Sequence, residues 1–169
     1  MVLLQSNLPQ MKKIVSLFIL IFTLSSCEES VTFSNPSVQG LMDNVIWRAI
    51  DFRATVDING ALKIEAYTQN QVLTLRTPSR NVGVYNLGEN SSRSATFTTE
   101  FDGVELLYTT GTNIGGDGQI VINSYDSATG TVSGTFRFNA INVNDNPLGG
   151  ELLNFQKGVF YNLKVTNAQ

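Results

Sequence analysis

Residues 50–67, IDFRATVDINGALKIEAY, decide the fold of this chain. Apolar and polar side chains alternate on both sides of Asn59-Gly60, which is typical of two strands joined by a tight turn. A two-residue loop at Asn59-Gly60 would place Val56 opposite Lys63 and would mix apolar and charged side chains on both faces. A three-residue loop, residues 58–60, separates an apolar face from a polar face, so we predict that loop.

The three-residue loop fixes every cross-strand pair of this predicted hairpin. Gly60 takes the left-handed conformation that such loops require, because glycine has no Cβ that would clash there. The predicted pairs are Val56–Leu62, Ala54–Ile64 and Phe52–Ala66 on the apolar face, and Thr55–Lys63 and Arg53–Glu65 on the polar face. A slip of one residue would exchange the two faces, so the pattern and the turn agree on one register.

A second hairpin is predicted over residues 95–108, with a two-residue turn at Asp102-Gly103. The predicted pairs on its apolar face are Phe101–Val104, Thr99–Leu106 and Phe97–Tyr108. The other face sets Glu100 opposite Glu105. We interpret both carboxylates as solvated; the alternative is a weak cation site or a shared proton. Two carboxylates alone are a poor calcium site, since calcium takes about six or more oxygens.

A third hairpin is predicted over residues 118–140, with its turn at residues 126–130. One face of its second strand carries Val132, Gly134, Phe136, Phe138 and Ala140. Residues 152–165 supply one or two further strands. Turn signals recur along the domain, and no helical segments alternate with the strands, which gives about eight to ten strands and disfavours a parallel sheet. We predict one all-β domain over residues 43–169, an antiparallel meander closed as a β-sandwich or flattened barrel.

The N-terminal residues 1–26 have the pattern of a secretory signal peptide. Lys12 and Lys13 precede a short apolar run, residues 14–24, and the small residues Ser25 and Ser26 follow it. The run is too short to span a bilayer, which needs about 20 apolar residues. Since the two lysines directly follow Met11, the spacing favours Met11 as the biological start.

Cys27 is the single cysteine of the chain. The tetrapeptide LSSC at residues 24–27 resembles a bacterial lipobox. This resemblance implies diacylglycerol on the Cys27 sulfur, cleavage before Cys27 and acylation of the new amino group. One acyl chain anchors a protein only marginally, whereas two or three chains together hold it stably on a membrane. We therefore expect Cys27 to be a lipid attachment site rather than the alternative, a free exposed thiol.

Residues 27–42 are expected to form the lipid-anchored tether. They show no sustained period and contain Pro36 and Gly40. Glu28 and Glu29, directly after the cysteine, resemble the surface-export signal of Bacteroidetes lipoproteins. The resemblance implies an outer-membrane lipoprotein and favours the cell surface over the periplasmic face. The alternative for the two glutamates is a solvated linker.

Composition narrows the possible chemistry. The absence of histidine removes the commonest general base and proton shuttle. A single cysteine excludes an internal disulfide and a cysteine-rich zinc site. The formal net charge is −3, and no basic cluster stands out, which argues against nucleic-acid binding. We predict no catalytic residue, no metal site and no cofactor.

Two loops and four aromatic residues are the candidate sites in the sequence. The glycine-rich residues 111–119 lack the Lys-Ser/Thr of a phosphate-binding loop, and residues 142–147 have too few acids for a calcium loop. Both are predicted to be connecting loops. Aromatic side chains that could stack on sugar rings are Trp47, Tyr67, Tyr85 and Tyr108. Of these, Tyr67 falls on the polar face of its hairpin and is the best exposed candidate, whereas Trp47 and Tyr108 are expected in the core.

The order of four segments resembles a known family. They are NVIWRA at residues 44–49, residues 82–98, residues 118–140 and GVFYNLKV at residues 158–165. After a lipobox and a tether, this order resembles small Bacteroidetes lipoproteins with a domain of unknown function. The family more often has Asn-Gly before the tryptophan, where this chain has residues 43–46, DNVI. The resemblance implies no catalytic residues.

Taken together, these features predict a non-enzymatic binding or interaction module of the cell envelope. Its partners would be the membrane, through the lipid anchor, and an unknown protein or glycan ligand. One alternative is a structural or accessory subunit of an outer-membrane assembly, and another is a carboxylate-based hydrolase. Exposed aromatics would favour a glycan, an apolar patch would favour a protein partner, and two close carboxylates in a cleft would favour the hydrolase.

Overall fold

Strands β3 (Asp51–Val56) and β4 (Leu62–Tyr67) form the first predicted hairpin in a computed structural model, which describes residues 37–101, 103–144 and 147–168. All five predicted pairs are confirmed, and Gly60 is left-handed at φ 87°. The Asp57 amide donates to the Ala61 carbonyl at 3.0 Å and closes the three-residue loop. Arg53 lies opposite Glu65 as expected, but the ion pair of Glu65 is with Lys63, at 3.1 Å.

The other two hairpins are confirmed in the same way. β7 (Ser94–Phe101) pairs with β8 (Val104–Thr109) in the predicted register, including Glu100 opposite Glu105. β9 (Asp117–Asp126) pairs with β10 (Thr131–Asn142), and the predicted inward face of β10 is buried. In the turn between β9 and β10, a hydrogen bond from the Thr129 hydroxyl, with the amides of Ala128 and Thr129, lowers the pKa of Asp126.

Eleven strands occur in the described residues, slightly more than predicted. The remaining strands are β1 (Val38–Met42), β2 (Val45–Arg48), β5 (Gln71–Thr77), β6 (Gly83–Asn86) and β11 (Leu152–Asn167). The segment predicted to supply one or two final strands is thus a single strand of 16 residues. β1 was not predicted as a strand, because its five residues show little alternation.

The domain begins earlier than predicted, because residues 38–42, expected in the tether, form β1. This strand pairs with both β2 and β11, and Val38 is fully buried. Asp43 and Asn44 make the two-residue turn to β2 with φ values of 49° and 67°. Such a turn usually carries glycine, although Asp and Asn also tolerate this region. Cys27 and the tether residues up to 36 lie outside the described residues.

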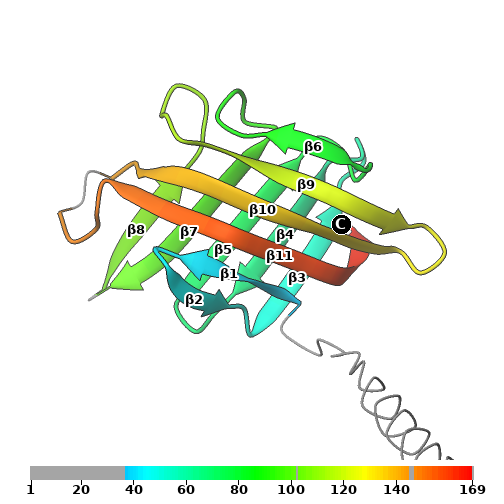
Figure 1. Ribbon diagram of the computed structural model, residues 1–169, viewed down its shortest axis with the longest axis horizontal. Coiled ribbons are helices and arrows are strands. Elements are labelled where there is room, and N and C mark those ends of the chain that lie inside the picture. The colour runs from blue at the N-terminus through cyan, green and yellow to red at the C-terminus, as the bar shows by residue number, and fades with distance from the viewer. Residues whose placement is uncertain (1–36, 102, 145–146, 169) are drawn as a thin grey trace, which may run out of the picture. The chain divides into compact units, whose positions relative to one another are not determined.

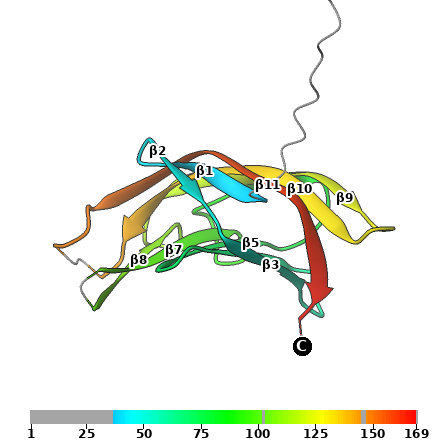
Figure 2. The ribbon, with the colours of Figure 1, turned by 90° about the horizontal axis from the view of Figure 1, so that it is seen from below.

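The strands form two packed layers (Figures 1 and 2). The front layer has the order β2-β1-β11-β10-β9-β6, and the back layer has the order β3-β4-β5-β7-β8. Figure 1 shows that strands of the two layers cross one another. The all-β fold is therefore as predicted, a β-sandwich or flattened barrel of mostly antiparallel strands. In the described residues no helix is long and apolar enough to cross a membrane.

Two corners join the layers into a closed ring. At one corner the last residues of β11 pair with β3, from Val165 opposite Ala54 to Asn167 opposite Val56. At the other corner Ile141 of β10 lies opposite Thr109 of β8. The β3–β11 pair is parallel, so the prediction of a purely antiparallel meander is wrong at this position. A strand of 16 residues is long enough to cross the front layer and still reach the back layer.

Aromatic rings fill the space between the layers. Phe155 of β11 is fully buried, and its ring centroid lies 5.2 to 6.0 Å from those of Phe97, Phe136, Phe138 and Trp47. Phe97 and Trp47 come from different layers, so Phe155 connects the two layers. This cluster packs the front layer against the back layer. The candidate site lies on the outer face of the front layer.

Candidate functional site

The predicted aromatic residues occupy different environments. Trp47 and Tyr108 are buried, 4% and 5% exposed, so their expected place in the core is confirmed. The Trp47 indole nitrogen donates to the side chain of Gln71 at 2.7 Å, which satisfies its one polar group. Burial raises the pKa of Tyr108. Neither side chain is available to stack on a ligand.

Tyr67 is half-buried, so its prediction as the best exposed aromatic is wrong. Burial, and then the charge of Glu65, raise the pKa of Tyr67. Tyr85 is also half-buried and donates its hydroxyl to the Asn81 carbonyl at 2.7 Å. The exposed tyrosine is Tyr161, whose side chain is 60% exposed on β11. Its neighbour Phe160 is fully buried, and strict alternation from that residue would have identified Tyr161.

The paired carboxylates Glu100 and Glu105 are both exposed at the end of the β7–β8 hairpin. The described residues contain no group of three or more acidic, cysteine or histidine side chains that could hold a metal ion. Solvation therefore remains the simplest interpretation of this pair.

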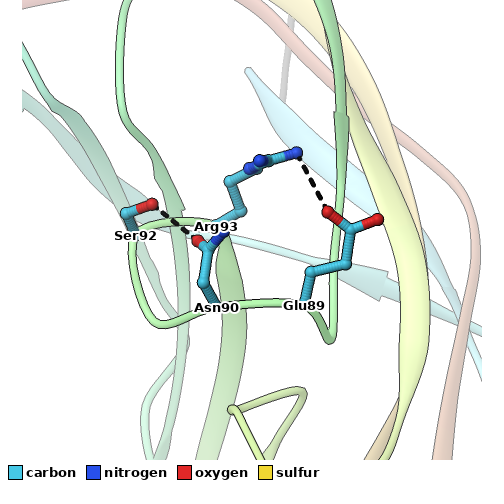
Figure 3. A network of polar contacts seen from close by, with 4 residues as sticks. All are labelled: Glu89, Asn90, Ser92 and Arg93. Atoms are coloured by element: carbon cyan, nitrogen blue, oxygen red, sulfur yellow. Dashed lines mark hydrogen bonds and ion pairs between the residues drawn. The ribbon is translucent and has the colours of Figure 1, made fainter.

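The loop between β6 and β7 is held closed by its own polar contacts (Figure 3). Glu89 and Arg93 form an ion pair at 3.3 Å, and the Ser92 hydroxyl donates to the Asn90 side chain at 2.6 Å. Exposed ion pairs of this kind contribute about 0–1 kcal/mol. Since these four side chains form two pairs within the loop, we interpret the loop as a connection rather than a site.

The predicted glycine-rich loop joins β8 to β9, and its last residues begin β9. A Cβ on Gly116 would lie 2.5 Å from the Asn139 carbonyl oxygen, and one on Gly118 would lie 2.2 Å from that of Arg137. These glycines thus allow the backbone to approach β10 closely. In the other predicted loop, residues 142–147, residues 145 and 146 lie outside the described part of the chain.

The close approach of β9 to β10 borders a cleft on the outer face of the front layer, the face turned toward the viewer in Figure 1. Its volume is about 330 Å³. The lining residues come from three strands: Asp117, Gly118, Arg137, Phe138, Asn139, Asn154, Phe155, Gln156 and Lys157. Phe138 and Phe155 are buried, so their backbones form the floor, while the polar side chains form the walls.

A ladder of amide hydrogen bonds crosses one side of the cleft. The Asn154 amide nitrogen donates to the Asn139 side-chain oxygen at 2.6 Å, and that of Asn139 donates to Asp117 Oδ1 at 2.7 Å. The backbone nitrogen of Asn154 also donates a hydrogen bond to the Asp43 carboxylate at 2.9 Å. We call Asp117, Asn139 and Asn154 the amide ladder. These bonds fix the orientation of each amide.

A β-bulge forms the other side of the cleft. Phe136 pairs with Gly158 and Phe138 with Phe155, so Arg137 on β10 lies opposite two residues of β11, Gln156 and Lys157. Gln156 and Lys157 are both exposed, and Lys157 has a φ of 50°. A bulge inserts one residue, disturbs the alternation and re-aims side chains. We call Arg137, Gln156 and Lys157 the cationic wall.

The cleft is suited to binding a polar ligand. It has donors on the cationic wall and fixed acceptors on the amide ladder. Among the residues that line it, Asp117 is the one carboxylate, whereas a glycosidase uses two that flank the scissile bond. The sequence analysis considered Asp117 and Gly118 only as part of the glycine-rich loop and did not predict this site, because its residues come from three strands and meet only in the folded sheet.

Comparisons with known proteins identify the family. Searches of curated proteins and of solved structures each returned no match. Residues 34–164 match the family described as Domain of unknown function (DUF6252), which confirms that part of the predicted resemblance. Because this match covers well over half of the sequence, the chain belongs to the DUF6252 family.

Proposed function

We propose that this protein is a lipid-anchored binding module of the outer membrane, of the Bacteroidetes lipoprotein type, and that its β domain binds a glycan in the cleft of the front layer. The observation that carries the binding proposal is the cleft itself. Its amide ladder holds hydrogen-bonding groups in fixed orientations on the rigid strands β9, β10 and β11. Glycans are recognised through many hydroxyl groups, and such preorganised donors and acceptors suit them.

The anchor proposal rests on Cys27 and the lipobox-like residues 24–27. Cys27→Ala should move the protein from the membrane fraction to the soluble fraction, because the acyl chains supply its membrane affinity. Cell fractionation with immunoblotting measures this, and protease treatment of intact cells then reports the leaflet. Rapid loss of the wild-type protein is expected, in line with display at the cell surface. If Cys27→Ala remained in the membrane fraction like the wild type, the lipid anchor would be wrong.

Glycan binding is tested with a panel of immobilised polysaccharides. The lipidated protein in detergent should be retained by at least one of them. The double variant Asn139→Ala/Asn154→Ala should bind that polysaccharide about tenfold or more weakly, since two ligand hydrogen bonds contribute about 1–3 kcal/mol together. Asn70→Ala, an exposed asparagine on the back layer, serves as the control and should bind like the wild type. Equal retention of the double variant would exclude this cleft as the site.

The second candidate function is an accessory subunit of an outer-membrane assembly. It is favoured by the sheet edge at β2, where Val45 and Ile46 are 67% and 65% exposed. Among the described residues β2 pairs only with β1, and unpaired edges with apolar residues are common sites of strand addition. No retention on the polysaccharide panel, together with a stable envelope complex that Ile46→Lys disrupts, would favour this alternative.

A further inference from the structure

We infer that the ligand of the cleft is an acidic saccharide: Arg137 and Lys157 bind its anionic group, and the amide ladder binds its hydroxyls. This inference rests on the proposed function and makes it more specific. It is carried by the distribution of charge and hydrogen-bonding capacity across the two sides of the cleft.

The cationic wall holds two positive charges on adjacent strands. Arg137 lies opposite the bulge that carries Lys157. Within the described residues, the one polar contact of the Arg137 side chain is a 3.2 Å hydrogen bond to Gln119, and Lys157 makes none. Two other cations of the domain do have carboxylate partners: Lys63 pairs with Glu65 and Arg93 with Glu89. Two neighbouring cations without a carboxylate partner form a site for an anion, and a guanidinium can bind a carboxylate in a bidentate manner.

The amide ladder offers acceptors to the same ligand. Asn139 and Asn154 each use an amide hydrogen for the bond to the next ladder member. Among the described residues, nothing donates to Asp117 Oδ2 or to the side-chain oxygen of Asn154. These two oxygens therefore remain available for donors such as hydroxyl groups. Asp117 is the one negative charge on the lining, and it stands at the side opposite Lys157.

The backbone of the cleft supports a ligand-binding role. Phe155 and Gly158 are both buried, so the bulge turns the two intervening residues toward solvent. Lys157 adopts the left-handed conformation, which residues other than glycine, Asn and Asp seldom adopt. Unusual backbone conformations of this kind cluster at ligand-binding positions.

The cleft suits a saccharide that is bound through its charge and its hydroxyl groups rather than by stacking on an aromatic ring. The rings of Phe138 and Phe155 point into the core, so the floor presents backbone rather than an aromatic face. An apolar peptide side chain or a base would find no aromatic surface to stack on there. A sugar that bears both an anionic group and hydroxyls can satisfy both walls at once.

The test compares an oligogalacturonate with its methyl ester, which has the same sugar units without the negative charge. Titration calorimetry is carried out on the full lipidated protein in detergent. The wild type should bind the acid at least tenfold more tightly than the ester, and this preference should shrink as salt is raised. Arg137→Gln and Lys157→Gln should each weaken binding of the acid about tenfold and should weaken binding of the ester clearly less, because the ester carries no negative charge. A sulfated oligosaccharide forms a third arm and shows whether sulfate can replace the carboxylate.

Arg76→Gln is the matched control, since Arg76 is an exposed strand residue of the back layer. It should bind both ligands like the wild type, and thermal melts should show that all three variants are folded. Equal affinity of the wild type for acid, ester and sulfated ligand would overturn the acidic preference and leave the glycan proposal standing. A preference for the acid that survives both cleft substitutions would overturn the assignment of the anion to this site. Failure to bind these ligands and the whole polysaccharide panel would overturn both proposals.

Discussion

Phe155→Ala is expected to lower the free energy of unfolding by about 4 kcal/mol, since removing a fully buried aromatic side chain loses its transfer free energy and leaves a cavity. Phe155 is 0% exposed and contacts rings from both layers, with Trp47 of the front layer at 5.5 Å and Phe97 of the back layer at 6.0 Å between centroids. Edge-to-face and offset pairs of this kind add about 0.5–1.5 kcal/mol beyond area burial.

Urea unfolding followed by circular dichroism measures this loss. Phe155→Leu should lose clearly less, because leucine fills part of the volume. Tyr161→Ala is the surface control on the same strand, and its side chain is 60% exposed, so its effect should stay within about 0.5 kcal/mol. A loss below about 1 kcal/mol for Phe155→Ala would contradict the arrangement in which this ring joins the two layers.

Gly134→Ala is the second large effect, with an expected loss of about 3 kcal/mol or more. A Cβ at this position of β10 would lie 2.0 Å from the Val121 carbonyl oxygen and 2.4 Å from the Phe160 ring. The carbonyl belongs to the paired strand β9 and cannot move aside without breaking backbone hydrogen bonds between β9 and β10. Position 134 therefore requires glycine, because any Cβ there would clash with its neighbours.

Thermal melts compare this variant with Gly150→Ala, where the nearest atom to a new Cβ is 3.7 Å away. Gly150→Ala should unfold like the wild type, whereas Gly134→Ala should unfold at a clearly lower temperature. Similar melting temperatures for the two variants would show that β9 and β10 are not as closely packed at Gly134 as described.

The core also determines the geometry of the candidate site. Asn139 directly follows the buried Phe138 on β10, and Asn154 directly precedes the buried Phe155 on β11. The packed rings therefore orient the two amides toward solvent. Loss of the Phe155 ring should thus loosen the amide ladder as well as the core. This links the stability of the fold to the ability of the cleft to bind its ligand.

The sequence by itself determined the local parts of this protein. The alternation on both sides of residues 58–60 and the glycine in that loop fixed the β3–β4 register, and the same argument fixed the β7–β8 register. Hairpins are predictable because both signals, the period of two and the turn residue, lie within a few residues of each other. Buried positions such as Trp47 and Tyr108 follow from the same alternation.

The tertiary structure alone decided which distant segments meet. β1 was missed because its turn, Asp43-Asn44, has no glycine, and its pairing with β11 becomes visible only in the assembled sheet. The parallel β3–β11 corner and the bulge at Lys157 likewise depend on packing between strands far apart in sequence. The cleft joins residues from β9, β10 and β11, and its cationic wall exists because the bulge breaks the alternation that the sequence pattern assumes.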